Sequence, residues 1–408
     1  MLLAAILRRF IREGRLRLVD ARGGRHEFLG RGGPSVAVRI TDRGLERRLL
    51  LNPDLALGEG YMDGHLVIEE GSLYELLDLL GRNYAHARRG LLAPLARLER
   101  VFRRLHQYNP GDRARRNVAH HYDLSGELYR LFLDSDRQYS CAYFEQPDMD
   151  LEQAQEAKKR HLAAKLLLRP GMRVLDIGSG WGGLALYLAR NFEVEVTGLT
   201  LSVEQLEEAR ARARREGLAD RVRFLLEDYR EHRGCYDRIV SVGMFEHVGI
   251  NHYRSFFAKL AELLTADGVA LLHSIGRMAG PGSTSPWIRR YIFPGGYIPA
   301  LSEVLPVVES LGLWACDLEI LRLHYAETLR RWRERFLANR ERVRELYDER
   351  FCRMWEYYLV ASEIFFRRLD GMVFQLQLAK ERDVVPLTRD YIHEAERELR
   401  LPALHAAE

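Results

Sequence analysis

The chain has few cysteines and no long apolar run. Only four cysteines occur in 408 residues, and none belongs to a C-x-x-C pair: Cys141, Cys235, Cys316 and Cys352. This spacing argues against a structural zinc site and a disulfide framework, and it favours a reducing compartment. No apolar stretch is long enough to span a bilayer. The first basic residues follow the apolar start instead of preceding it, so we predict no secretory signal.

The length and composition are those of a globular protein with two domains. The 408 residues are 47% apolar and 29% charged, which permits a large buried core. The short runs "SVAVRITD", "RRLLLNPDL" and "HLVIEEG" resemble strands, and glycines and prolines punctuate them, so they predict a small α+β domain. We place this domain at residues 1–105, a linker at 106–117 and the second domain at 118–408.

Positive charge is concentrated in one segment although the net charge is only +4. Residues 82–116 contain ten arginines and two acids, with leucines interleaved. Such a segment suits anionic lipid or nucleic acid, and a solvated helix face explains it equally well. Residues 2–11 carry apolar side chains at helical spacing. We expect this first helix to pack on the N-terminal domain, with membrane contact as the alternative.

Strands and helices alternate from about residue 118. "MRVLDIGSGWGG", "EVEVTGLT", "RVRFLLED", "DRIVSVGMFEHV" and "GVALLHSIG" read as strands separated by helical segments. This order predicts a parallel sheet with helices on both faces. "LEILRLH" and "MVFQLQLA" are the expected last strands. Two helical stretches, 326–347 and 351–368, lie between them.

The first of these strands ends in a glycine-rich turn, which lets a ligand approach the backbone at a helix N-terminus. The glycines are Gly178, Gly180, Gly182 and Gly183. A nicotinamide site would need an acid at the end of the second strand, where the chain instead reads "TGLTLSVEQ". The acid here is Asp176, just before the glycines, and it suits a ligand with a sulfonium and an ammonium group. The turn resembles the S-adenosylmethionine loop of class I methyltransferases, with their Rossmann-like doubly wound sheet.

Seven motifs in order extend this resemblance to a family. They are "HHYDLSGELYRLFLDSDRQYSCAYF", "VLDIGSGWGGLALYLA", "TGLTLSVEQ", "MFEHVG", "LLHSIG", "RYIFPGGYIP" and "HYAETLRRW". Together they resemble the cyclopropane-fatty-acyl-phospholipid synthase family, and the basic N-terminal third is similar to the extra domain of its phospholipid-acting branch. The resemblance implies methylene transfer from S-adenosylmethionine to the cis double bond of an unsaturated phospholipid chain. A carbocation would form and lose a proton to a bound bicarbonate ion.

The resemblance also implies the site residues and no metal. The bicarbonate cage would comprise Cys141, Glu246, His273, the backbone amide of Ile275, and Tyr325. The cofactor contacts would be Tyr139, Ser140, Asp176, Gly178, Gly180, Thr200, Gln205, Asp228 and Tyr229. Taken alone, Cys141 would more often be ordinary core, and its place inside a matched motif favours the functional interpretation. Residues 291–296 are expected to line the acyl channel. Ser362 stands where many relatives have a further cysteine, so a second active-site thiol is in doubt.

The implied partners are an unsaturated phospholipid and an anionic membrane surface. A cytoplasmic protein bound peripherally to the inner face of the membrane is expected, and a homodimer is an option. Nucleic acid is not expected, because "DPPY"-like tetrapeptides are absent and the basic segment lies outside the catalytic domain. Two alternatives stay open: a related fatty-acyl C-methyltransferase that makes a methyl- or methylene-branched chain, and a lipid-binding protein with an inactive transferase domain.

Overall fold

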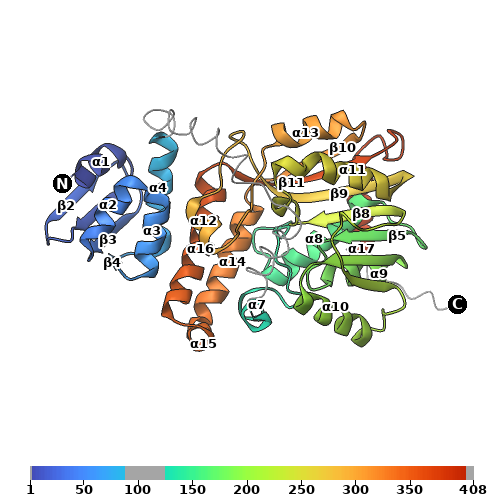
Figure 1. The fold of residues 1–408 in the computed structure, drawn as a ribbon, viewed down its shortest axis with the longest axis horizontal. Coiled ribbons are helices and arrows are strands. Elements are labelled where there is room, and N and C mark those ends of the chain that lie inside the picture. Colours follow the sequence, from blue (N-terminus) through green and yellow to red (C-terminus); the bar gives the residue numbers. More distant parts are fainter. Residues whose placement is uncertain (1, 88–124, 401–408) are drawn as a thin grey trace. The chain divides into compact units, whose positions relative to one another are not determined.

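The computed structural model of the protein describes residues 2–87 and 125–400, which form two compact units (Figure 1). The first unit takes its described residues from 1–106, 282–294 and 326–371, and the second from 107–281, 295–325 and 372–408. The helical stretches that follow residue 325 therefore group with the N-terminal residues. The predicted linker at 106–117 and most of the arginine-rich segment lie outside the described residues.

The first unit contains a four-stranded sheet in the order β2-β1-β3-β4, in which only β1 and β3 run parallel. Its N-terminal elements are α1 (Leu2–Phe10), β1 (Arg15–Val19), β2 (Arg25–Leu29), β3 (Ser35–Ile40), α2 (Arg43–Leu51), α3 (Pro53–Met62), β4 (Leu66–Glu70) and α4 (Leu73–Ala87). Strands and helices share one apolar core, which includes Leu16, Val36, Leu45 and Leu79. The predicted small α+β architecture is confirmed.

One predicted strand of this unit is wrong. The run "RRLLLNPDL" is helical and lies in α2 and α3 instead of forming a strand. Asp42 caps α2, because its carboxylate accepts from the amides of Gly44 and Leu45. Asn52 caps α3 in the same way, and Pro53 stands at the first turn, where its missing N–H costs nothing. These local capping signals outweigh the strand propensity of the leucines.

Helix α1 packs on the core of the first unit, as expected. Leu3, Ala4 and Ile11 are buried, whereas Leu2 and Ile6 point into solvent and are 66% and 48% exposed. The later helices of the unit are α12 (Pro286–Tyr291), α14 (His324–Ala338), α15 (Arg340–Leu346) and α16 (Glu349–Arg368). None of the helices within residues 2–87 and 125–400 combines the length and apolar character needed to cross a bilayer.

The second unit is built on a seven-stranded sheet in the order β10-β11-β9-β8-β5-β6-β7. The strands β9, β8, β5, β6 and β7 run parallel, and β10 pairs antiparallel with β11. The strands are β5 (Arg173–Ile177), β6 (Glu195–Thr200), β7 (Val222–Leu226), β8 (Tyr236–Val242), β9 (Leu264–Arg277), β10 (Trp314–Leu321) and β11 (Gly371–Ala379). The helices are α7 (Gly126–Phe132), α8 (Leu151–Leu166), α9 (Gly183–Phe192), α10 (Val203–Arg215), α11 (Tyr253–Leu263), α13 (Leu301–Ser310) and α17 (Asp390–Arg400), with short 3-10 turns at Phe245–His247 and Ile250–His252.

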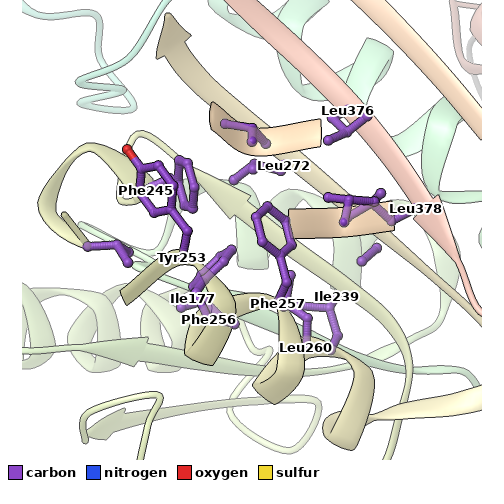
Figure 2. Packing of buried hydrophobic residues seen from close by; sticks show 14 of the residues in the cluster. Ile177, Ile239, Phe245, Tyr253, Phe256, Phe257, Leu260, Leu272, Leu376 and Leu378 are labelled. Carbon is purple, nitrogen blue, oxygen red and sulfur yellow. The ribbon is translucent and has the colours of Figure 1, made fainter. Parts of the chain in front are cut away.

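Two apolar clusters cover the two faces of this sheet. Because side chains alternate along a strand, Leu272 joins one cluster and its neighbour Leu271 the other. Figure 2 shows the first cluster, where Phe256, Phe257 and Leu260 of α11 meet the strand residues. Helices α8, α9 and α10 supply the second cluster. The predicted doubly wound α/β sheet of class I methyltransferases is confirmed.

Candidate functional site

All nine predicted cofactor residues line a single pocket of the second unit, which we call the cofactor pocket. They are Tyr139, Ser140, Asp176, Gly178, Gly180, Thr200, Gln205, Asp228 and Tyr229. They come from the loop after α7 and from the chain segments at the carboxyl ends of β5, β6 and β7. Parallel strands bring their carboxyl ends to one edge of the sheet, and open α/β sheets bind ligands at that edge. The sheet therefore brings motifs that are separate in the sequence together in one concave site.

The turn after β5 needs glycine for two separate reasons. Gly178 has φ 87°, and a Cβ there would come within 2.9 Å of the Met244 side chain. Gly180 has φ 53°, and an added Cβ would meet no atom within 4 Å, so its backbone faces open space. The first glycine permits close packing, and the second leaves room for a ligand against the backbone.

Asp176 is the buried acid of the cofactor pocket. It stands inside β5, as the sequence predicts, and is only 2% exposed. Burial raises the pKa of Asp176 to about 7, and the charge of Lys158 opposes part of that rise. A cationic ligand at this carboxyl would favour its ionised form. The site is therefore suited to the ammonium group of S-adenosylmethionine.

Lys158 is a functional candidate that the sequence reasoning missed. This residue of α8 is fully buried, and its Nζ donates to Ser140 Oγ at 2.8 Å and to Gln138 Oε1 at 2.6 Å. Burial lowers the pKa of Lys158 to about 8, against the opposing charge of Asp134. Because the Lys158 ammonium donates to a lone pair of the Ser140 oxygen, the Ser140 hydroxyl must direct its own proton away from Lys158. A lysine on the buried face of a helix was the signal that could have revealed it.

Two further loops complete the cofactor pocket. Thr200 ends β6, and its Oγ1 donates to Gln205 Oε1 at 3.0 Å, which fixes the amide of Gln205. After β7, Asp228 receives two hydrogen bonds from the Arg230 guanidinium, at 2.9 and 2.5 Å. Arg230 also lies over the Tyr229 ring, 5.9 Å from its centroid. The predicted adenine-side carboxylate is thus held in place by an arginine.

Arg137 and His247 also line the cofactor pocket, although the sequence analysis did not assign them. Arg137 has φ 58°, which is unusual for a residue other than glycine, and its guanidinium lies 4.7 Å from the Trp181 centroid. Glu208 accepts a hydrogen bond from Arg137 at 2.7 Å. Burial lowers the pKa of His247 to about 4, so this ring is neutral at physiological pH.

Glu246 is a buried carboxyl that stands in the sequence between Met244 and His247, and both of these residues line the cofactor pocket. Its Oε1 accepts from the Ile275 amide at 2.6 Å. Its Oε2 is buried and has no hydrogen-bond partner among the described residues. Burial raises the pKa of Glu246 to about 7, and the Ile275 amide and the Ser274 side chain oppose that rise. One oxygen is therefore fixed, and the other is available for a ligand.

His273 stands two residues before Ile275 on β9, and because Ile275 donates to Glu246 we call Glu246, His273 and Ile275 the acid–base cluster. His273 is only 2% exposed, and Gln375 Nε2 lies 3.2 Å from its Nδ1. Burial lowers the pKa of His273 well below its ordinary value, and the charge of Lys158 acts in the same direction. The Ile275 amide was predicted to hold the anion, and here it donates to Glu246.

The two remaining predicted residues, Cys141 and Tyr325, are buried. Cys141 follows Ser140, and its thiol lies 3.3 Å from the carbonyl oxygen of Ala142. Tyr325 stands in the first turn of α14. A contact between either residue and an anion stays a prediction.

Comparisons with known proteins agree on one family. Residues 110–376 match the family model described as mycolic acid cyclopropane synthetase. The chain is 39% identical over 366 residues to cyclopropane-fatty-acyl-phospholipid synthase of Escherichia coli strain K12, covering 87% of this chain and 92% of the relative. It is 37% identical over 389 residues to tuberculostearic acid methyltransferase UfaA1 of Mycobacterium tuberculosis, covering 92% and 90%.

The fold is likewise similar to a solved member of that group. A crystal structure of mycolic acid cyclopropane synthase CmaA1 complexed with SAH and CTAB aligns with a TM-score of 0.62 at 35% sequence identity. The alignment covers 66% of this chain and 99% of that chain. The whole of the solved enzyme therefore has a counterpart here, and about a third of this chain lies outside it.

Proposed function

The chain belongs to the mycolic acid cyclopropane synthetase family, and from that premise we propose that it is a cyclopropane-fatty-acyl-phospholipid synthase. It is an S-adenosylmethionine-dependent transferase, and S-adenosylmethionine is its co-substrate. The proposed acceptor is the cis double bond of an unsaturated phospholipid acyl chain. The similarity to the E. coli synthase over 87% of the chain supports this acceptor.

The observation that carries the proposal is the state of Glu246. A buried carboxyl with one oxygen held by a backbone amide and the other without a partner among the described residues costs stability. Such a group is expected where a ligand completes its hydrogen bonds. Met244 and His247, which flank Glu246 in sequence at two residues and one residue, line the cofactor pocket and support placing the reacting atoms there.

The reaction makes one ring from an alkene and one carbon. S-adenosylmethionine supplies, when bound, an electrophilic methyl group on a sulfonium. The alkene π pair bonds to that methyl carbon while the carbon–sulfur bond breaks, and its electron pair stays on sulfur. The carbocation then loses a proton from the new methyl group, and the released C–H electron pair forms the third ring bond. The products are the cyclopropane, S-adenosylhomocysteine and one proton.

This chain's own residues would hold the co-substrate and remove the proton. Asp176 would pair with the ammonium group, and the Gly178–Gly180 backbone would lie against the ligand. A bound bicarbonate, which would supply the proton acceptor, fits the polar atoms present: the unpaired Glu246 oxygen, the neutral His273 ring, the Cys141 thiol and Tyr325. The Ile275 amide already donates to Glu246, so it would bind an anion as well only through a bifurcated hydrogen bond. Residues 291–296 would line the acyl channel.

A second candidate function is a fatty-acyl C-methyltransferase that gives a methyl- or methylene-branched chain. The similarity to tuberculostearic acid methyltransferase UfaA1 over 92% of this chain supports it. Both reactions share the first methyl transfer and differ only in how the carbocation is discharged. Product structure separates them. The third alternative, a lipid-binding protein with an inactive transferase, is disfavoured because Glu246, His273, Tyr325 and the glycine turn are all present.

We further propose peripheral binding to the cytoplasmic face of an anionic membrane. The arginine-rich segment 82–116 and the exposed Leu2 and Ile6 support it. Each basic residue near an anionic surface contributes about 1 kcal/mol, so several suffice for reversible docking. A homodimer would let two such surfaces meet one bilayer. Flotation with anionic vesicles tests the proposal, and unchanged binding after six arginines are replaced by glutamate would overturn it.

The test of the activity uses purified full-length protein, S-adenosylmethionine and anionic vesicles with cis-monounsaturated chains. Released fatty acids are analysed by mass spectrometry and proton NMR. A gain of one CH₂ unit with upfield cyclopropane protons supports the proposal, and the Glu246→Gln variant should not make this product. The same gain with a surviving alkene signal would identify the second candidate. No gain, despite measurable binding of S-adenosylhomocysteine, would overturn both.

A further inference from the structure

A chain of buried polar side chains leads from α8 to His273. Lys165 Nζ lies 2.8 Å from Gln375 Oε1, and Gln375 Nε2 lies 3.2 Å from His273 Nδ1. Gln375 stands on β11 and His273 on β9, which are neighbouring strands of the seven-stranded sheet (Figure 1). Lys165 and Gln375 have no exposed surface, and His273 is 2% exposed. Water therefore does not compete for these hydrogen bonds.

The lysine decides which way the Gln375 amide faces. Lys165 is ion-paired with Glu319 and lies 3.6 Å from an Asp317 oxygen, so it is held as an ammonium. An ammonium only donates, and therefore the atom of Gln375 that faces it must be the carbonyl oxygen. The NH₂ group of Gln375 is then the one that faces His273. The orientation of a buried amide is usually inferred from its neighbours, and here a single cation defines it.

The amide in turn decides which nitrogen of His273 is protonated. An NH₂ group only donates, so Nδ1 of His273 must offer its lone pair. A protonated Nδ1 would point its hydrogen at the two hydrogens of the amide. This excludes both the Nδ1–H tautomer and the doubly protonated ring. Burial and the charges of Lys158, Lys165 and His161 lower the pKa of His273, which is consistent with a neutral ring.

We propose that Lys165 and Gln375 are positioning residues that hold neutral His273 as the Nε2–H tautomer, so that the ring presents a hydrogen-bond donor to its ligand. Neither residue touches the reacting atoms. A glutamate at position 375 would accept from Nδ1–H and favour the opposite tautomer of the neutral ring, whereas glutamine donates to Nδ1 and favours the Nε2–H tautomer. The catalytic consequence rests on the proposed function, and the tautomer itself does not.

The first test needs no variant. The full-length protein is labelled with ¹⁵N in its histidine rings, and the His273 signals are identified by their loss in His273→Gln. We expect a neutral ring with its proton on Nε2 between about pH 6 and 8, the range in which an ordinary histidine titrates. A proton on Nδ1, or an imidazolium in that range, would overturn the proposal.

The second test changes the donor and uses a matched control. Gln375→Glu should move the proton to Nδ1 and lower kcat about 10²-fold, as expected when one oriented donor is lost, with KM for S-adenosylmethionine nearly unchanged. Gln377→Glu is the control, because this buried glutamine of the same strand donates to the Lys165 carbonyl and Tyr391 instead of His273. It should leave the tautomer in place. An unchanged His273 spectrum in Gln375→Glu would contradict the proposal.

The outcomes separate this inference from the proposed function. A wild-type Nδ1–H tautomer together with loss of turnover in His273→Gln would overturn the inference and leave the function intact. An Nε2–H tautomer that Gln375→Glu abolishes without any loss of kcat would support the assignment and overturn the role of His273 in the reaction. If Gln375→Glu does not fold, Gln375→Met removes the donor without adding charge, and a mixture of both tautomers is then expected.

Discussion

The cofactor pocket is made largely of turns that follow successive strands, whereas the acid–base cluster depends on side chains far apart in the sequence. In the pocket, Gly178, Thr200 and Asp228 each stand at the end of a strand or just beyond it. In the cluster, Glu246 is fixed by an amide 29 residues away and His273 by a glutamine 102 residues away. The pocket is thus encoded locally, and the cluster is assembled by the folded chain.

The two regions also differ in how their charges are treated. Arg230 pairs with Asp228 in the pocket, whereas Glu246 in the cluster keeps one oxygen without a partner in the described part of the chain. The paired Asp228 is held in place to contact a ligand, and the remaining oxygen of Glu246 can take part in proton transfer. The difference indicates that substitutions in the cluster will change turnover, and substitutions in the pocket will change affinity.

The largest expected effect is on turnover in Glu246→Gln. Loss of a positioned acid–base group should lower kcat about 10³-fold, while binding of S-adenosylhomocysteine stays within about threefold of wild type. Gln retains the oxygen that accepts from Ile275, so the fold should be kept. Single-turnover assays and calorimetric titration measure the two quantities. A large loss of affinity would show that the cluster and the pocket are not separate.

The same variant should be more stable than wild type at alkaline pH. Burial raises the pKa of Glu246 from its ordinary value of 4.5 to about 7 in the folded protein. Between these values the unfolded state loses a proton that the folded state keeps, so the unfolding free energy falls as pH rises. The wild type loses about 3 kcal/mol of unfolding free energy in this way above pH 7, and a glutamine at position 246, which does not titrate, avoids the loss. Thermal unfolding at pH 5 and pH 8 tests it, and equal stability differences at both would contradict it.

Asp176→Asn should weaken cofactor binding about 10²-fold and flatten its pH dependence. Because the pKa of free Asp176 is about 7, a cationic ligand must displace a proton below that pH. Affinity of the wild type should therefore rise up to tenfold per pH unit and level off above pH 7. Calorimetric titration with S-adenosylhomocysteine, in two buffers of different ionisation enthalpy, counts the released proton. A flat wild-type profile would rule out this role.

Lys158→Met should have a smaller effect, about tenfold on cofactor affinity, because the donor that orients Ser140 is lost. The Lys158 charge also opposes the raised pKa of Asp176. Its removal should shift the midpoint of the affinity profile to higher pH. Lys259→Met, which breaks an ion pair with the exposed Glu262 outside the cofactor pocket, is the matched control. An unshifted midpoint would show that Lys158 acts on the fold alone.

The smallest effect is expected in Cys141→Ser. If Cys141 is part of an anion's wall and not a nucleophile, kcat should stay within about fivefold of wild type, equivalent to ~1 kcal/mol. The thiol is 1% exposed, so it should also react with thiol reagents far more slowly than the exposed Cys235. Complete loss of turnover in a folded Cys141→Ser protein would instead identify a covalent or strongly acidic role.

Much of the fold could be predicted because its signals are local. The alternation of strand and helix, the glycine turn and the placement of Asp176 inside β5 were all readable along the chain. The strand predicted at "RRLLLNPDL" was wrong, because capping by Asp42 and Asn52 outweighed the apolar pattern. The stretch 326–347 was predicted as one helix and is two, α14 and α15, which meet at Asn339.

The sequence by itself determined the cofactor pocket, since parallel strands carry the residues at their ends to one edge whatever the rest of the chain does. Only the tertiary structure decided the chemistry of the acid–base cluster. The tautomer of His273 depends on Gln375, and the amide of Gln375 depends on Lys165, which is 210 residues away. A hydrogen bond acts over about 3 Å, so its consequences become visible only when folding has brought donor and acceptor together.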